Sequence, residues 1–150
     1  MLNAKTGTSV NPDSRVAGQE AANAVKSLKH MKMAFVYSGV QYDQKELLRA
    51  ISNELPDVPL IGNTSFTGII TQDGFITGEN GFVGIMALGD EYMTVGVAGE
   101  PKRGSARETG HRAAQAAMER AGKDRSPDYF YMVAPPGEEE FYLKGITEVI

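Results

Sequence analysis

The hydrophobic and polar positions of the first part of the chain alternate between short apolar runs and longer stretches of helical spacing. Contiguous apolar and β-branched residues predict strands, and apolar residues three or four positions apart predict helices. The pattern predicts strands over residues 4–10, 33–37 and 58–61, and helices over 14–29 and 43–55. Because a helix separates each strand from the next, the pattern favours a β-α-β-α-β unit with parallel strands.

After residue 61 the apolar runs become shorter and closer together. Polar turns rich in glycine separate them, and these turns are too short for a parallel crossover, so they predict an antiparallel meander. A third helix, a last strand and a last helix are expected to follow. The predicted meander strands are 68–71, 75–77, 82–88 and 93–98, and the later elements are a helix between Ser105 and Gly122, a strand over 129–133 and a helix over 138–149. The whole order predicts an α/β fold with one mixed sheet and helices on its faces, in a single domain over residues 1–150.

Local capping signals support the helix boundaries. Asp13 closes a turn sequence suited to an N-cap, and Asp43 and Ser105 each precede a glutamate three residues later, as in a capping box. Gly122 is expected to end the third helix, because glycine readily adopts the left-handed conformation of a C-cap.

Composition narrows the class of protein. With 41% hydrophobic and 23% charged residues in 150, the chain is typical of a folded domain, and its net charge of -4 argues against a nucleic-acid partner. The basic residues between 102 and 125 are interrupted by acidic ones and are interpreted as a solvated helix face. No cysteine is present, which excludes disulfides and thiolate sites. No apolar run reaches the ~20 residues of a membrane span, so we expect no membrane association and a cytoplasmic location.

Small polar residues follow several of the predicted strands, and they are the candidate binding residues. Parallel strands end at one edge of a sheet, where α/β folds place binding groups. Asn63 offers donors and acceptors, the hydroxyls add more, and Gly62 leaves backbone N–H groups accessible to a carboxylate. The candidate ligand-binding residues are Ser9, Ser38, Tyr42, Gly62, Asn63, Thr64 and Ser65. The alternative is that each one satisfies only its own turn or cap.

Evidence for catalysis in the sequence is sparse. Only His30 and His111 could act as bases at neutral pH, and neither belongs to a metal-binding spacing. No nucleophile elbow and no glycine-rich phosphate loop with a lysine is present. We therefore expect a binding domain that is not an enzyme, with no catalytic residues, no metal and no cofactor.

Four segments together resemble the N-terminal domain of the FIST family, the sensory domains of signalling proteins. They are residues 16–22 (VAGQEAA), 35–38 (FVYS) before Tyr42, 59–65 (PLIGNTS) and 81–88 (GFVGIMAL). The loop after the third strand departs from the family pattern Gly-Cys-Ser/Thr-Thr-Ala-Gly-Glu at Asn63 and over residues 66–68. The resemblance implies a domain that binds a small polar metabolite, with amino acids or their derivatives as the ligand class.

The resemblance also implies a partner domain for this chain. The family domain is normally longer and precedes a C-terminal FIST domain or a signalling output domain, whereas this sequence ends while its helical pattern continues, so we expect an incomplete domain that forms a homodimer. Two alternatives remain open: an enzyme of unknown reaction, and a protein-interaction scaffold without a ligand that docks a partner strand at the meander edge around residues 75–77.

Overall fold

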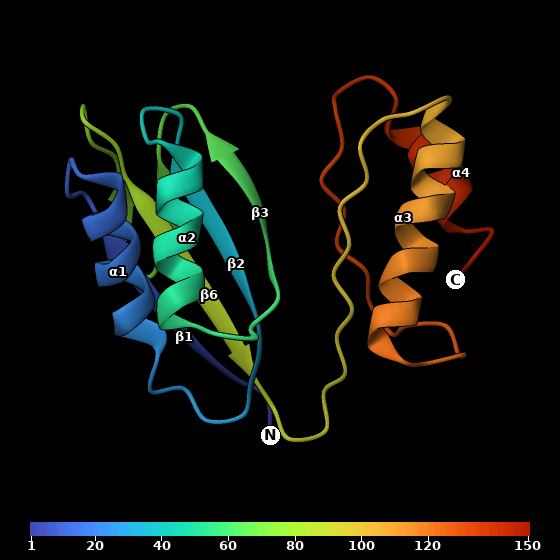
Figure 1. Cartoon of the computed structure of the whole chain (residues 1–150), viewed down its shortest axis with the longest axis horizontal. Helices are drawn as coiled ribbons and strands as arrows, with labels where there is room; N and C mark the ends of the chain where they lie inside the picture. The colour runs from blue at the N-terminus through green and yellow to red at the C-terminus, as the bar shows by residue number, and fades with distance from the viewer. The chain divides into compact units, whose positions relative to one another are not determined.

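The computed structural model describes all 150 residues of the chain, which form two compact units (Figure 1). The first unit is Met1–Met93 and the second is Thr94–Ile150. The expectation of a single domain over residues 1–150 stays a prediction.

A four-stranded sheet forms the centre of the first unit, and it is mixed, as the sequence predicted. Its strands, in spatial order, are β1 (Asn3–Ser9), β6 (Val83–Gly89), β2 (Met31–Gly39) and β3 (Leu60–Ser65). β2 pairs with β3 in parallel, and β6 is antiparallel to both β1 and β2. β1, β2 and β3 therefore run in the same direction, and their carboxyl ends lie at one edge of the sheet.

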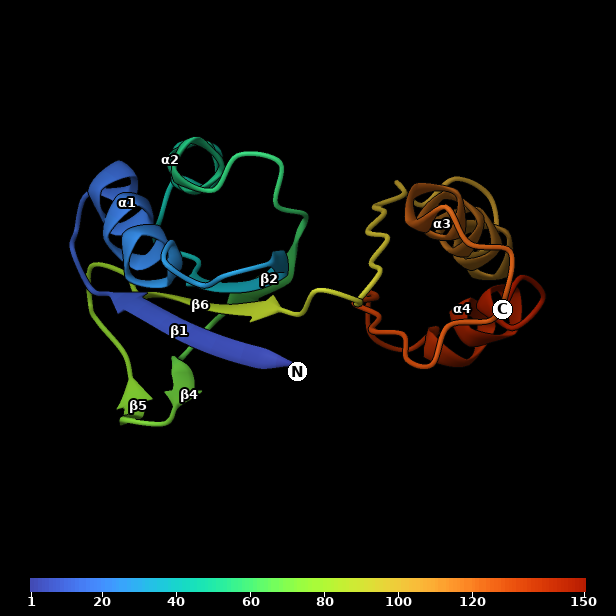
Figure 2. The ribbon, with the colours of Figure 1, turned by 90° about the horizontal axis from the view of Figure 1, so that it is seen from below.

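Helices α1 (Ser14–Val25) and α2 (Gln44–Glu54) cover one face of this sheet (Figure 2). Asp13 and Asp43 cap them as predicted: Asp13 accepts a hydrogen bond from the N–H of Val16, and Asp43 accepts from the N–H groups of Lys45 and Glu46. Small residues let the two helices approach closely, since a Cβ on Gly18 would lie 2.8 Å from the carbonyl oxygen of Leu47. The core between helices and sheet includes Ala17, Ala21, Val25, Val36, Leu47, Ile51, Val83 and Ile85. Burial of each larger aliphatic side chain contributes about 1.5–3 kcal/mol to stability.

The predicted meander is not formed as a continuous sheet. Strands β4 (Ile69–Thr71) and β5 (Gly74–Ile76) make a separate antiparallel hairpin, which lies on the sheet face opposite the helices (Figure 2). β6 pairs with β1 on one side and β2 on the other, so both of its edges are occupied. No edge of β6 is left for residues 75–77 or 93–98, and the latter residues form no strand.

The second unit is built on two packed helices, α3 (Ala106–Ala121) and α4 (Glu139–Ile146). Ser105 and Glu108 form the predicted capping box, and Gly122 ends α3 in the left-handed conformation. Gly145 permits the close contact, because a Cβ there would collide with the carbonyl oxygen of Arg107. No helix of the chain combines the length and apolar character required to cross a bilayer.

Three predictions for this part of the chain were wrong. Residues 129–133 form no strand, and α4 is shorter than the predicted 138–149. The apolar segment 94–98 packs on α3 instead of pairing in a sheet: a Cβ on Gly96 would meet the backbone of Ala117, and Arg120 donates to the carbonyl of Val97. A strand exists only where a partner strand satisfies its backbone groups, and these segments have strand composition without that partner.

Candidate functional site

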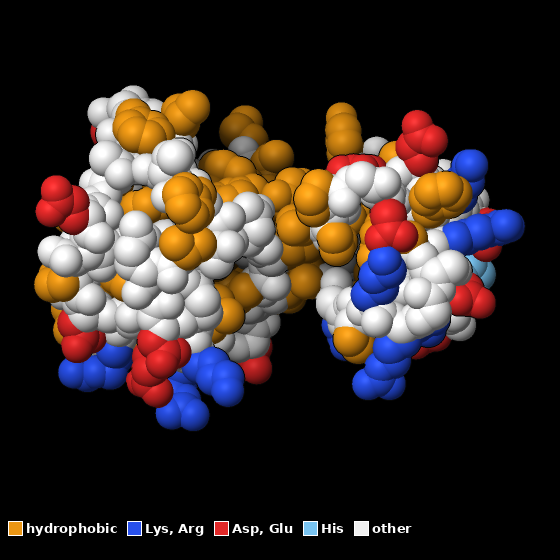
Figure 3. Space-filling view, turned by 90° about the horizontal axis from the view of Figure 1, so that it is seen from above, with side chains coloured by type: hydrophobic (Ala, Val, Ile, Leu, Met, Phe, Trp, Pro, Cys, Tyr) orange, Lys and Arg blue, Asp and Glu red, His pale blue; other side chains and the backbone are white.

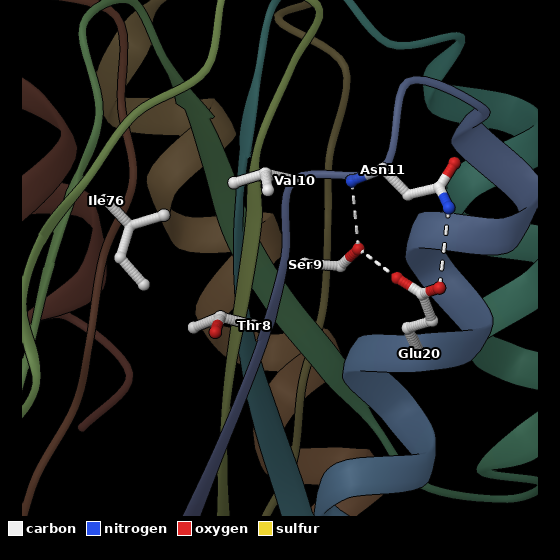
Figure 4. Close-up of a pocket in the computed structure, with 6 residues that line it drawn as sticks. All are labelled: Thr8, Ser9, Val10, Asn11, Glu20 and Ile76. Carbon is white, nitrogen blue, oxygen red and sulfur yellow. Dashed lines mark hydrogen bonds between the residues drawn. The ribbon is translucent and has the colours of Figure 1, made fainter.

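A pocket of about 540 Å³ lies at the carboxyl end of β1 (Figure 4). Its lining residues come from the end of β1, the turn after it, α1 and β5, and they are Thr8, Ser9, Val10, Asn11, Glu20 and Ile76. The end of β1 divides the pocket, with Thr8 and Ile76 on one side and Ser9, Asn11 and Glu20 on the other (Figure 4). One side is therefore polar, and the other contributes apolar surface.

The polar side is a hydrogen-bonded network centred on the carboxylate of Glu20. The Ser9 hydroxyl donates to Glu20 Oε2 at 2.5 Å, and Asn11 Nδ2 donates to Glu20 Oε1 at 3.4 Å. The backbone N–H of Asn11 donates to the Ser9 Oγ at 3.1 Å. The carboxylate thus holds the end of β1 against α1, and no Lys or Arg forms an ion pair with it.

The turn between β1 and α1 positions this network. The Asn11 side chain accepts a hydrogen bond from the backbone N–H of Asp13 at 3.0 Å, and Asp13 in turn caps α1 by accepting from the N–H of Val16 at 2.8 Å. The turn fixes the start of α1, so Glu20 on the second turn of the helix faces the end of β1.

Tyr42 extends the network from α1 toward α2. Its side chain is only 5% exposed, and its hydroxyl donates to the carbonyl oxygen of Asn11 at 2.6 Å. The ring packs against Gly81, where any Cβ would collide with it. Burial, and after it the negative charge of Glu20, raises the pKa of the Tyr42 hydroxyl above its ordinary value of 10.0.

Ser38 lies at the carboxyl end of β2 and is also buried. Its hydroxyl donates to Gln44 Oε1 at 2.8 Å, and the Gln44 amide donates to the carbonyls of Gly39 and Tyr42 at 2.9 and 3.2 Å. Ser38 and Gln44 therefore fix the loop that carries Tyr42.

The predicted residues on β3 do not line the pocket. Gly62 lies within β3, where a Cβ would collide with the carbonyl of Val36. The exposed Asn63 donates to the carbonyl of its neighbour Thr64 at 2.9 Å. Ser65 donates to the carbonyl of Gly68 at 2.6 Å and so closes the turn that follows β3. A binding role for these residues stays a prediction.

Among the predicted residues, only Ser9 lines the pocket, and Tyr42 touches it through Asn11. The sequence analysis did not select Asn11, Glu20 or Ile76. A signal for Glu20 was present, because it stands three residues after Ala17 and four before Ala24, with Val16 and Asn23 on the same side of the helix. A single charged residue on such a face indicates a position at the edge of the buried contact.

A second pocket, of about 530 Å³, lies beside the start of α3. Arg107, His111, Arg112, Glu108 and Glu148 line it together with Ser105. Glu148 pairs with Arg107 and with His111, whose Nδ1 lies 3.3 Å away, and the hydrogen bond from Arg107 lowers the pKa of the Glu148 carboxyl. Glu108 is engaged in the capping box. Because Glu148 and Glu108 are engaged in this way, we take the first pocket as the candidate site.

Neither pocket resembles a metal centre, since no group of three or more His, Asp or Glu side chains could hold an ion.

Compared with the models of protein families, the chain matches the FIST N domain over residues 32–150. No curated protein matches the chain.

Proposed function

Because the chain belongs to the FIST N domain family, we propose that it is a sensory domain of a signal transduction protein and binds a small polar metabolite. The pocket at the end of β1 is the observation that carries this proposal. Binding sites for small molecules combine an apolar wall with a few convergent polar groups, and Val10 and Ile76 supply the first while Ser9, Asn11 and Glu20 supply the second. The family resemblance supports an amino acid or a related metabolite as the ligand.

The hydrogen bonds behind the pocket support a path by which a bound ligand would affect the start of α2. A ligand that displaces Asn11 would disturb the acceptor of the Tyr42 hydroxyl, and Tyr42 directly precedes the N-cap Asp43 of α2. The backbone N–H of Asp43 also donates to the Ser14 hydroxyl at 3.0 Å, which ties the starts of α1 and α2 together. Signalling by this route requires that the ligand bind one arrangement of these groups more tightly than another.

A thermal-shift screen of the full chain against amino acids and common metabolites tests the binding proposal. A ligand at 100 times its dissociation constant adds about 2.7 kcal/mol to the free energy of unfolding, enough to raise the melting temperature by several degrees. A hit that Ser9→Ala weakens would place the ligand in the β1 pocket. If no compound shifts the melting temperature, the proposal fails.

The loop after β3 can be tested in the same assay. Asn63 is exposed and its side chain bonds only to the adjacent backbone, so Asn63→Ala should leave the stability of the free protein almost unchanged. Weaker ligand binding by this variant would add the β3 loop to the site, and unchanged binding would exclude Asn63.

We further propose that the domain acts by binding and not by catalysis. His111, one of the two histidines, is engaged with Glu148, and His30 is exposed at the turn before β2. Chemical conversion of a bound ligand, followed by mass spectrometry, would instead support an enzyme.

A protein-interaction role is the second candidate, and the hairpin favours it. Ile70 and Phe75 are directly paired across β4 and β5 and are 88% and 61% exposed, while Ile69 faces Gly84 of the sheet. In Figure 3 hydrophobic side chains project at the top of the left-hand unit, away from its Lys and Arg side chains. Exposed apolar surface of this kind is typical of docking sites.

Two partners remain part of the proposal. We propose self-association into a homodimer, which the exposed hairpin supports, and a functional link to a C-terminal FIST domain or a signalling output domain, which family membership supports. We do not propose nucleic acid as a partner, because the chain carries a net charge of -4.

A further inference from the structure

We infer that the ligand of the β1 pocket carries a protonated amine, that the Glu20 carboxylate binds this amine, and that the ligand needs no carboxylate. This inference rests on the proposed binding function of the same pocket, and it assigns a ligand class that differs from the amino acids supported by the family resemblance. It follows from three features of the pocket: an unpaired negative charge, the absence of a positive one, and an apolar surface beyond the charge.

The Glu20 carboxylate retains capacity for a ligand. Its two oxygens can accept about four hydrogen bonds, and the protein supplies one short bond from Ser9 and one long bond from Asn11. The side chain is exposed and has no ion-pair partner, whereas Glu54, for example, pairs with Lys26. An ammonium group carries three donors and one positive charge, which matches the free acceptors and the charge of this carboxylate.

Nothing comparable is present for a ligand carboxylate. None of the residues that line the pocket is positively charged. The sequence contains no Lys or Arg between Arg49 and Lys102, so β3, β4, β5 and β6 contribute none. The hydroxyl of Ser9 already donates its one proton to Glu20, and the amide of Asn11 uses one of its two N–H groups there, so the pocket offers a ligand anion only uncharged donors. A ligand carboxylate near Glu20 would therefore meet like charge without compensation.

The remaining surface suits a hydrocarbon chain. Val10 is 53% exposed at the end of β1, and Ile76 lies across the strand end from Glu20 (Figure 4). An amine held at Glu20 would place its carbon chain over Val10 and toward Ile76. The geometry therefore favours an alkylamine or a diamine over a short zwitterionic amino acid.

The test uses n-hexylamine, its uncharged N-acetyl derivative and hexanoate as probes, titrated into the full chain at neutral pH and followed by amide NMR shifts. Hexylamine should shift the amides of Ser9 and Asn11, and the other two compounds should bind at least about tenfold more weakly, as expected for loss of a charged hydrogen bond. Shortening the amine by one methylene should weaken binding by up to about fourfold.

Matched variants identify the carboxylate. Glu20→Gln keeps the size and an acceptor for Ser9 but removes the charge, and it should lose the preference for hexylamine over its acetylated form. Glu119→Gln makes the same change at an exposed position on α3 and should behave like the wild-type chain. Glu20→Asp retains the charge, so it should retain the preference even if the shorter side chain lowers the affinity.

The outcomes separate this inference from the proposed function. Equal binding of hexylamine and its acetyl derivative, or an unchanged preference in Glu20→Gln, overturns the amine assignment. If amino acids or carboxylates bind the wild-type chain while amines do not, the binding function stands and the inference fails. If neither the probes nor any metabolite binds, both fail.

Discussion

Gly81 leaves room for the ring of Tyr42, whose hydroxyl bonds to the pocket residue Asn11. Gly81 has a φ of +121° and lies against the Tyr42 ring. Gly74 has a similar φ of +118°, but no atom lies within 4 Å of the position that a Cβ would take there. Both positions require a positive φ, but only Gly81 is in contact with a neighbouring side chain. The comparison therefore separates conformational strain from the packing of Tyr42.

Gly81→Ala should destabilise the fold more than Gly74→Ala does. Each change forces a side chain into a positive φ, at a cost of about 1–3 kcal/mol, and Gly81→Ala also pushes the buried Tyr42 ring away from its partner. Urea unfolding of both variants measures the difference. Equal losses in free energy would show that Tyr42 moves without cost.

Tyr42 also predicts a dependence of stability on pH. Its pKa is raised in the folded protein, so above pH 10 the unfolded chain loses the hydroxyl proton before the folded chain does. The stabilisation is fully present below pH 10 and is lost as the pH rises through the folded pKa. Unfolding midpoints between pH 8 and pH 11 should fall less steeply in Tyr42→Phe than in the wild-type chain. If the unfolding midpoints of the two proteins fell equally with pH, the raised pKa of Tyr42 would be contradicted.

At neutral pH the same substitution tests the hydrogen bond itself. Tyr42→Phe removes the donor to the Asn11 carbonyl and should lower the free energy of unfolding by about 0.5–1.5 kcal/mol. A loss near zero would mean that water replaces the hydroxyl at this acceptor.

The helices begin and end at the capping residues. Asp13, Asp43, Ser105 and Gly122 occupy the caps that the sequence predicted, because capping depends on residues within one turn of the helix end. The strands behave differently. Residues 93–98 and 129–133 have strand composition but form none, since a strand depends on a partner that can lie far away in the chain.

Removing the N-cap of α3 tests how much such a cap contributes to stability. Ser105→Ala removes the hydroxyl that accepts from the Glu108 N–H, while the backbone N–H of residue 105 can still donate to Glu108, and it should lower the stability of the second unit by about 1 kcal/mol. Ser126→Ala, at an exposed position outside the helices, is the matched control and should change little. Helical circular dichroism during urea unfolding reports the result, and identical midpoints for the two variants would argue against a stabilising cap.

For the whole molecule, the proposed homodimer can be assigned to a particular surface. The hairpin exposes Ile70 and Phe75 on its outer face, and its neighbour Phe66 is 82% exposed. A chain that associates through this surface should form dimers at high concentration. The double variant Ile70→Ser, Phe75→Ser removes the apolar pair while leaving Ile69 in contact with the sheet.

Light scattering should give a dimer mass for the wild-type chain and a monomer mass for the double variant. Leu48→Ser, on the exposed side of α2, is the control and should remain dimeric, because it changes an exposed apolar residue elsewhere. A wild-type monomer at high concentration would contradict self-association, and a dimeric double variant would move the interface away from the hairpin.

The sequence by itself determined the α/β class, the helix caps and the membership of the FIST N family, because each depends on local pattern or on residues read in order. Only the tertiary structure decided that β6 lies between β1 and β2 and that Glu20 faces Ser9 across the turn. Both arrangements join residues brought together by the path of the chain, and that path depends on the packing of helices and strands that no local pattern specifies. For this reason the pocket at β1 includes the predicted Ser9 but none of the predicted residues on β3.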